Sequence, residues 1–130
     1  MPKITMLFVS LHILLMLVLA VRVVGHRRSL KIGIGDGGDK LLARKVRVHA
    51  NFIEYVPVAL LMLALLELAG LAAIWLWVLG GTLLLARILH AAGLSRHSGY
   101  SFGRFWGTLL TWLALLAMSG MGVGIFFGAR

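Results

Sequence analysis

The residues with the clearest chemical potential lie in one short stretch, Arg47-Val-His-Ala-Asn-Phe-Ile-Glu-Tyr-Val-Pro57. On a helix, Arg47, Asn51 and Glu54 stand at i, i+4 and i+7, so they project from one face. A guanidinium clamps carboxylates, an amide donates and accepts hydrogen bonds, and a carboxylate accepts from an ammonium group. This stripe therefore suits a small zwitterionic or polyanionic ligand.

The stretch opens a long apolar run, and the whole composition indicates an integral membrane protein. Hydrophobic residues make up 61% of the 130 residues, and the mean hydropathy is +0.99. Polar side chains at the edge of a membrane segment are costly unless they pair, meet water or bind something. The chain has no cysteine, so thiol chemistry at this stretch would need a thiol brought by a ligand.

The net charge of +9 comes from 13 Lys+Arg against 4 Asp+Glu. In a soluble protein that balance would indicate nucleic acid. Here membrane topology explains it, because basic residues collect in cytoplasmic loops, and no nucleic-acid partner is expected. Contacts with anionic lipid headgroups or with an anionic ligand remain open.

The apolar runs predict a single domain over residues 1–130, an all-α bundle of four transmembrane helices. Each run is long enough to cross about 30 Å of hydrocarbon. The first run exceeds the ~7–15 residues of a signal-peptide core and no small-residue cleavage site follows, which favours a spanning helix. Gly80-Gly81 and the small residues of 119–124 suit close helix contacts, and Pro57 should kink the second helix. The expected spans are residues 4–25, 46–69, 72–93 and 105–127.

The connections at residues 26–45 and 94–104 hold most of the basic residues, whereas the turn between the second and third spans has none. The positive-inside rule then places both basic loops in the cytoplasm and both termini on the opposite side. The first loop contains a glycine-rich turn, residues 33–38, but lacks the GxxxxGK[ST] pattern of a phosphate-binding loop.

The polar residues of several elements should converge at the cytoplasmic face. Arg87 lies at a depth similar to that of Glu54 and is its candidate partner, either in a structural ion pair or in a ligand site. A deep arginine would also lower the pKa of a bound thiol and hold its thiolate. No carboxylate pair, Ser-His-Asp order or metal-ligand spacing is evident, so no metal site is expected. The converging residues are Arg27, Arg28, Arg47, His49, Asn51, Glu54, Arg87, His90, Arg96 and Arg104.

The stretch resembles the second-helix motif R-x-x-x-N-x-x-E-Y-x-P of the MAPEG superfamily. That superfamily comprises the microsomal glutathione transferases, the leukotriene and prostaglandin E synthases, and bacterial relatives. The four-helix layout, the basic first loop and Arg87-x-x-His90 agree as well, so the resemblance covers essentially the whole chain. The sequence looks most like the short bacterial branch, which implies a bacterial inner membrane protein.

The resemblance implies a homotrimer that binds glutathione, as co-substrate, between neighbouring subunits. By position, the glutathione peptide would contact Arg47, Asn51, Glu54 and Tyr55. Further contacts would come from His49, from His90, and from Arg27 or Arg28 in the first loop. Arg104 is the nearest match to the arginine that activates the thiol, with Arg96 as a rival.

The sequence also departs from the family pattern. Leu94 stands where the conjugating members have a tyrosine that contacts glutathione, and Ala50 replaces an arginine of the prostaglandin synthase type. The leading hypothesis is a membrane-bound glutathione-dependent transferase or peroxidase acting on lipophilic electrophiles or hydroperoxides. The alternative is a non-catalytic lipid or small-ligand binding protein on the same scaffold. A transporter is less favoured, because no inverted repeat or helix-long polar stripe is present.

Overall fold

The computed structural model describes residues 1–96 and 99–128, apart from the side chain of Arg96. All four helices are long and apolar enough to cross a membrane. This confirms the predicted all-α architecture with four spans. The helices are α1 (Lys3–Leu30), α2 (Lys40–Leu68), α3 (Ala73–Arg96) and α4 (Phe102–Phe126).

The helices reach further into the basic connections than hydropathy predicted. Asp39 starts α2 six residues before the expected position, because its Oδ1 accepts the N–H of Leu42 at 2.6 Å and so caps the helix. Helix α1 continues to Leu30 and ends where Lys31 adopts a left-handed conformation. Most basic residues assigned to the first loop therefore lie on helix ends. Helix α2 continues as a helix through Pro57.

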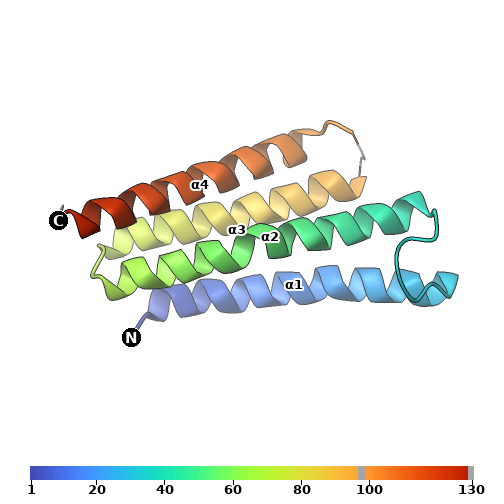
Figure 1. The fold of residues 1–130 in the computed structure, drawn as a ribbon, viewed down its shortest axis with the longest axis horizontal. Coiled ribbons are helices and arrows are strands. Elements are labelled where there is room, and N and C mark those ends of the chain that lie inside the picture. The colour runs from blue at the N-terminus through green and yellow to red at the C-terminus, as the bar shows by residue number, and fades with distance from the viewer. Residues whose placement is uncertain (97–98, 129–130) are drawn as a thin grey trace.

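The helices lie side by side along one long axis (Figure 1). Helix α3 packs against the other three, whereas α1 and α4 share no contact within the described residues. The connections that follow α1 and α3 lie at one end of the bundle, and the termini lie at the other with the α2–α3 turn (Figure 1). The expected grouping of the two basic connections is thus present; which end faces the cytoplasm remains a prediction.

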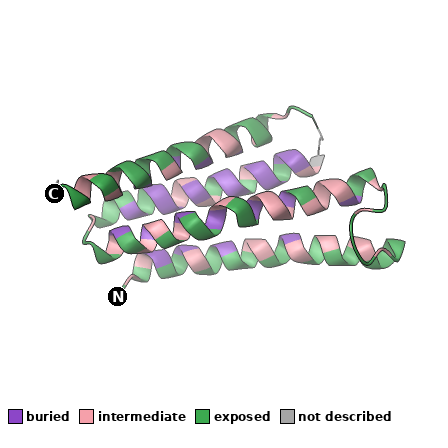
Figure 2. Cartoon of the chain, in the orientation of Figure 1, coloured by how far each residue is buried: buried purple, intermediate pink, exposed green. Residues whose placement is uncertain are grey.

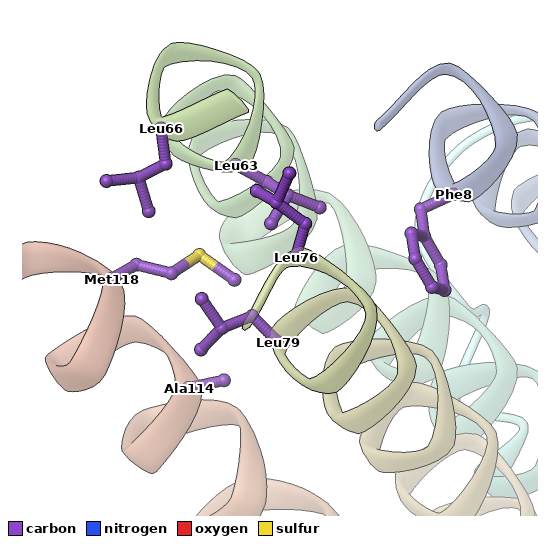
Figure 3. Packing of buried hydrophobic residues seen from close by; sticks show 7 residues of the cluster. All are labelled: Phe8, Leu63, Leu66, Leu76, Leu79, Ala114 and Met118. Atoms are coloured by element: carbon purple, nitrogen blue, oxygen red, sulfur yellow. The ribbon is translucent and has the colours of Figure 1, made fainter. Parts of the chain in front are cut away.

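Two apolar clusters form the core. The first joins all four helices near the end that carries the termini (Figure 3), and its buried residues are Phe8, Leu63, Leu66, Leu76, Leu79, Ala114 and Met118. The second lies toward the basic end, with Leu19, Val48, Phe52, Val56, Ala91 and Leu94 buried. Buried residues are concentrated on α3, while exposed residues run along α1 and α4 (Figure 2). Since lipid tails are as apolar as leucine, these helices associate mainly through close packing.

Glycines bring α3 and α4 into backbone contact. A Cβ placed on Gly107 would lie 2.6 Å from Cβ of His90 and 2.7 Å from the carbonyl oxygen of Ala86. Gly103 and Gly93 approach the facing backbone in the same way. This seam fixes the position of α4 relative to α3, and hence of any side chain that α4 presents to a site.

The glycines that the sequence indicated for helix contact behave unequally. Gly80 lies against the ring of Phe8, so it admits α1 close to α3, whereas Gly81 meets nothing within 4 Å. In the small-residue run of α4, Gly122 meets the side chain of Met62 and Gly120 meets nothing within 4 Å. The expectation therefore holds for Gly80 and Gly122.

A carboxylate of α2 caps the first turn of α1. Oε1 of Glu67 accepts the N–H of Ile4 at 3.0 Å, and Oε2 accepts the N–H of Thr5 at 2.7 Å. Pro2, the N-cap residue of α1, supplies no side-chain hydrogen bond there. Because the first N–H groups of a helix have no partner within it, Glu67 satisfies two of them from another helix.

Candidate functional site

The stripe of α2 presents an ion pair on the outside of the bundle. Nη1 of Arg47 donates to Oε1 of Glu54 at 3.0 Å, and the two side chains are 60% and 48% exposed. Both residues lie on the face that helical spacing predicted. An exposed guanidinium beside an exposed carboxylate offers complementary groups to a zwitterionic ligand.

Asn51 turns into the bundle, where Oδ1 accepts a 2.8 Å hydrogen bond from Nη1 of Arg87. The expected pairing of Arg87 with Glu54 is therefore wrong. Glu54 is displaced from Asn51 by about 60° around the helix axis, so a similar depth does not give the two side chains the same direction. Glu54 instead meets Arg47, seven residues away on its own helix.

Arg87 is the buried charge of the site, with 2% of its surface exposed. Its Nη2 donates to Oγ1 of Thr111 at 2.7 Å and to the carbonyl oxygen of Gly107 at 3.3 Å. The guanidinium lies 5.6 Å from the centre of the Tyr55 ring, within cation–π range. Arg87 thus joins α2, α3 and α4 through neutral acceptors. The sequence did not indicate Thr111 as a partner of Arg87, because a single threonine within an apolar span carries no distinguishing signal.

Tyr55 connects this network to α4. Nε1 of Trp112 donates to the Tyr55 hydroxyl oxygen at 3.2 Å, so the hydroxyl hydrogen is available for another acceptor. Trp112 also forms part of a groove of about 410 Å³ along α4. The groove has one arginine near its polar end and mostly apolar walls below it. Its lining is Tyr100, Ser101, Arg104, Phe105, Thr108, Leu109 and Trp112.

Arg104 stands in the first turn of α4 and is exposed. Its backbone N–H is capped by Oγ of Ser101 at 3.3 Å, and its Nη1 donates to the carbonyl oxygen of Gly99 at 3.4 Å. The guanidinium is thereby held at the rim of the groove. The side chain of Arg96, the rival candidate, lies outside the described residues, so the choice between the two arginines remains a prediction.

Among the remaining predicted site residues, His90 borders the Arg87 network, because Gly107 beside it accepts a hydrogen bond from Arg87. His90 is buried in the α3–α4 seam beside Gly107. Arg27 and Arg28 end α1, which has no contact with α4 in the described residues, and Nη1 of Arg27 donates to the carbonyl oxygen of Gly33 at 3.2 Å. His49 is half-buried on α2. His, Asp and Glu residues form no group of three suited to a metal ion in the described part of the chain.

The two departures from the family pattern occupy different environments. Leu94 is 5% exposed and belongs to the core cluster of the basic end, so this position packs inside the bundle. Ala50 is half-buried on α2. A leucine in the core offers no hydrogen-bonding group, unlike a tyrosine hydroxyl.

Comparison with known proteins defines the class. The sequence model of the MAPEG family matches residues 5–124, and the chain belongs to this family. It is also 32% identical, over 112 residues, to the inner membrane protein YecN of Escherichia coli strain K12, covering 86% of this chain and 84% of the relative. YecN of Escherichia coli O6:H1 gives the same identity and coverage. The resemblance carried by the Arg47–Pro57 stretch is therefore confirmed at the level of the family.

Proposed function

We propose that this chain is a glutathione-dependent transferase or peroxidase of the bacterial inner membrane, acting on lipophilic electrophiles or hydroperoxides. One observation carries the proposal: the exposed Arg47–Glu54 pair lies on the same helix as Tyr55, which is bonded to the wall of an apolar groove. Membership of the MAPEG family and the similarity to an inner membrane protein support it.

The groups fit a tripeptide with two carboxylates, an ammonium and a thiol. Arg47 clamps a carboxylate, and Glu54 accepts hydrogen bonds from the ammonium. Asn51 is held by Arg87, so its oxygen orients the arginine while its amide N–H₂ group remains a donor. Tyr55 offers the hydroxyl hydrogen that Trp112 leaves available.

The groove supplies the second half of the reaction. An apolar substrate would enter from the bilayer between Phe105, Leu109 and Trp112. Arg104 at the rim stabilises the thiolate of glutathione, because a nearby positive charge lowers a thiol pKa. The apolar walls of the groove lower the local dielectric constant and so strengthen this electrostatic effect.

With an electrophile, the thiolate sulfur bonds to the electrophilic carbon and displaces the leaving group as an anion. With a hydroperoxide, the sulfur attacks the terminal oxygen and breaks the O–O bond, and the alkoxide that leaves is protonated to the alcohol. A second glutathione thiol then converts the sulfenic acid to the disulfide and water.

The proposed assembly is a homotrimer with its sites between subunits and its basic end in the cytoplasm. Arg47 and Glu54 point away from the bundle, where a neighbouring subunit would complete the site. Arg27 lies at the end of α1, which has no contact with α4 in the described residues, so its contact with glutathione would come from a second subunit. The two basic connections lie at one end, as the positive-inside rule requires of cytoplasmic loops.

A direct test measures conjugation of glutathione to an aryl halide, and glutathione-dependent reduction of an organic hydroperoxide, with the purified full chain. Arg104→Ala should lower turnover, and Glu54→Ala should raise the glutathione KM. Lys40→Ala, at the same end of the bundle, serves as the matched control and should leave both unchanged. Equal rates for the wild type and the two site variants would refute the proposal.

A non-catalytic lipid or small-ligand binding protein is the second candidate. The burial of Leu94 favours it, because that position offers no hydroxyl to glutathione. The apolar groove could hold a ligand without any chemistry. Saturable glutathione binding without turnover over a broad panel of electrophiles would favour this candidate over the enzyme.

A further inference from the structure

The end of α1 forms a second cationic site, separate from the Arg47–Glu54 pair. A shallow pocket of about 440 Å³ has cationic and apolar walls, and no carboxylate in its described lining. The two acidic residues of the same connection are engaged elsewhere. Asp36 accepts the N–H of Gly38 at 2.9 Å, and Asp39 caps α2. The lining residues are Val24, Arg27, Arg28, Lys31, Ile32 and Gly33.

The pocket continues an exposed stripe along α1. Leu17, Val21, Val24, Arg28 and Lys31 are spaced by four and three residues, which keeps them on one helix face. All five are exposed. The apolar part from Leu17 to Val24 rises about 10 Å along the axis. The stripe is therefore apolar at the depth of the hydrocarbon and cationic where the helix ends. This arrangement is complementary to a phospholipid with apolar acyl chains and an anionic headgroup.

Lys31 adds a second observation. It ends α1 in the left-handed conformation, with φ of 56°, and it is the one non-glycine residue with positive φ in the described chain. Its N–H donates to the carbonyl oxygen of Arg28 at 3.2 Å, and the N–H of Ile32 donates to that of Arg27 at 3.0 Å. Glycine adopts this conformation without strain, whereas the lysine at this position adds an ammonium group to the pocket lining at a cost in backbone strain.

We propose that the end of α1 binds an anionic phospholipid, with the headgroup phosphate between Arg28 and Lys31 and an acyl chain along Leu17, Val21 and Val24. Arg27 holds the pocket wall through the carbonyl oxygen of Gly33. The occupant is a lipid and not a soluble phosphate, because the apolar stripe leads directly away from the cations. This site does not depend on the proposed glutathione chemistry.

The test is native mass spectrometry of the full chain, released from neutral detergent with equimolar phosphatidylglycerol and phosphatidylcholine and without glutathione. The wild type should retain phosphatidylglycerol in preference. The double variant Arg28→Gln, Lys31→Gly should reduce that preference by tenfold or more. Each cation near an anionic headgroup contributes roughly fivefold to the affinity, and the variant removes two. Lys31→Gly alone should lose about fivefold; it relieves the strained backbone, so the loss cannot come from unfolding.

Lys40→Gln is the matched control, since Lys40 is exposed, starts α2 at the same end and does not line the pocket. It should keep the preference of the wild type. A wild type with no preference, or an equal loss in Lys40→Gln, overturns the proposal. So does stabilisation of the chain by glycerophosphate, which has no acyl chain, to the same extent as by phosphatidylglycerol. Because no glutathione is present, none of these outcomes bears on the proposed enzyme activity.

Discussion

Nη1 of Arg87 donates a 2.8 Å hydrogen bond to Oδ1 of Asn51, and this contact joins α3 to the middle of the polar stripe of α2. The same guanidinium also bonds to Thr111 and Gly107 of α4. Asn51 therefore has a structural partner that its position in the sequence did not reveal. The stripe contains two kinds of residue: Asn51, which is held inside, and the Arg47–Glu54 pair, which is free to meet a ligand outside.

Asn51→Leu should destabilise the chain by about 1–3 kcal/mol, because it leaves a buried guanidinium N–H without its acceptor. Ile53→Ala, on the exposed side of the same helix, should change stability by less than about 0.5 kcal/mol. Reversible unfolding in mixed detergent micelles measures both. Equal stabilities of the two variants would show that the Arg87 network does not hold α2 to α3.

Gly107→Ala should separate α3 from α4, since the new Cβ would overlap backbone and Cβ atoms of His90. Overpacking of this kind costs about 1–3 kcal/mol. Gly120→Ala lies on the same helix with nothing within 4 Å, so it should be neutral or stabilise by up to about 1 kcal/mol. Opposite signs in an unfolding assay would support the seam; equal destabilisation would contradict it.

Glu67→Ala should expose the first turn of α1, because the N–H groups of Ile4 and Thr5 lose their acceptors. Loss of a helix cap costs about 0.5–2 kcal/mol, which corresponds to roughly twofold to thirtyfold faster amide exchange in that turn. Glu67→Gln keeps an acceptor oxygen but loses the charge, and should give an intermediate rate. Hydrogen exchange resolved at Ile4 and Thr5 measures the effect, and unchanged rates would rule out the cap.

The four spans could be predicted from the sequence because hydropathy over about 20 residues reports burial in lipid directly. The helix ends could not be predicted as well. Residues such as Arg27 and Lys45 are polar, so hydropathy places them outside the membrane. A helix can still continue there, because it satisfies its own backbone hydrogen bonds in water as well, and the cap at Asp39 sets the start of α2. Hydropathy finds where the membrane ends, whereas capping decides where the helix ends.

The candidate site could be predicted only in part, for a geometric reason. The face shared by Arg47 and Glu54 follows from spacing along one helix. The partner of Arg87 depends on how α2 and α3 are rotated about their axes relative to each other. The depth of a residue in the membrane does not determine this rotation. Contacts such as Glu67 with Thr5, 62 residues apart, are likewise invisible to local patterns.

The start of α2 should depend on pH through Asp39. Its carboxylate accepts the N–H of Leu42 and lies 3.2 Å from Nε2 of His26, and these hydrogen bonds lower the pKa of Asp39. A carboxyl group with a lowered folded-state pKa contributes stability above its unfolded pKa of about 4, and the contribution is lost as pH falls through the lower folded value. Amide protection at Leu42 should therefore fall below about pH 4.

Asp39→Asn is the control for that titration, because an amide oxygen can still cap the helix but does not ionise in this range. Protection of Leu42, measured by hydrogen exchange from pH 3 to pH 6 and corrected for intrinsic rates, should then lose its pH dependence. Amides in the middle of α2 serve as the internal reference. A wild type whose Leu42 protection follows that reference at every pH would show that the cap does not respond to ionisation.

Glu54→Gln should leave the stability of the chain nearly unchanged while weakening glutathione binding. The Arg47–Glu54 pair is exposed at 60% and 48%, so breaking it should change the unfolding free energy by less than about 1 kcal/mol. If Glu54 accepts the ammonium of glutathione, the same change removes a hydrogen bond between charged groups. That loss is worth about 1.5–3 kcal/mol, or roughly tenfold to a hundredfold in Kd.

Equilibrium dialysis with labelled glutathione, paired with unfolding of the same preparations, makes this comparison. Asn51→Leu should give the opposite result. It should lower the stability of the chain directly and change glutathione binding only indirectly, through the displacement of Arg87. A Glu54→Gln protein that is as stable as the wild type but binds glutathione weakly identifies Glu54 as a ligand contact. If binding is unchanged, the pair is an ordinary surface ion pair, and recognition of glutathione must be sought at the groove beside Arg104.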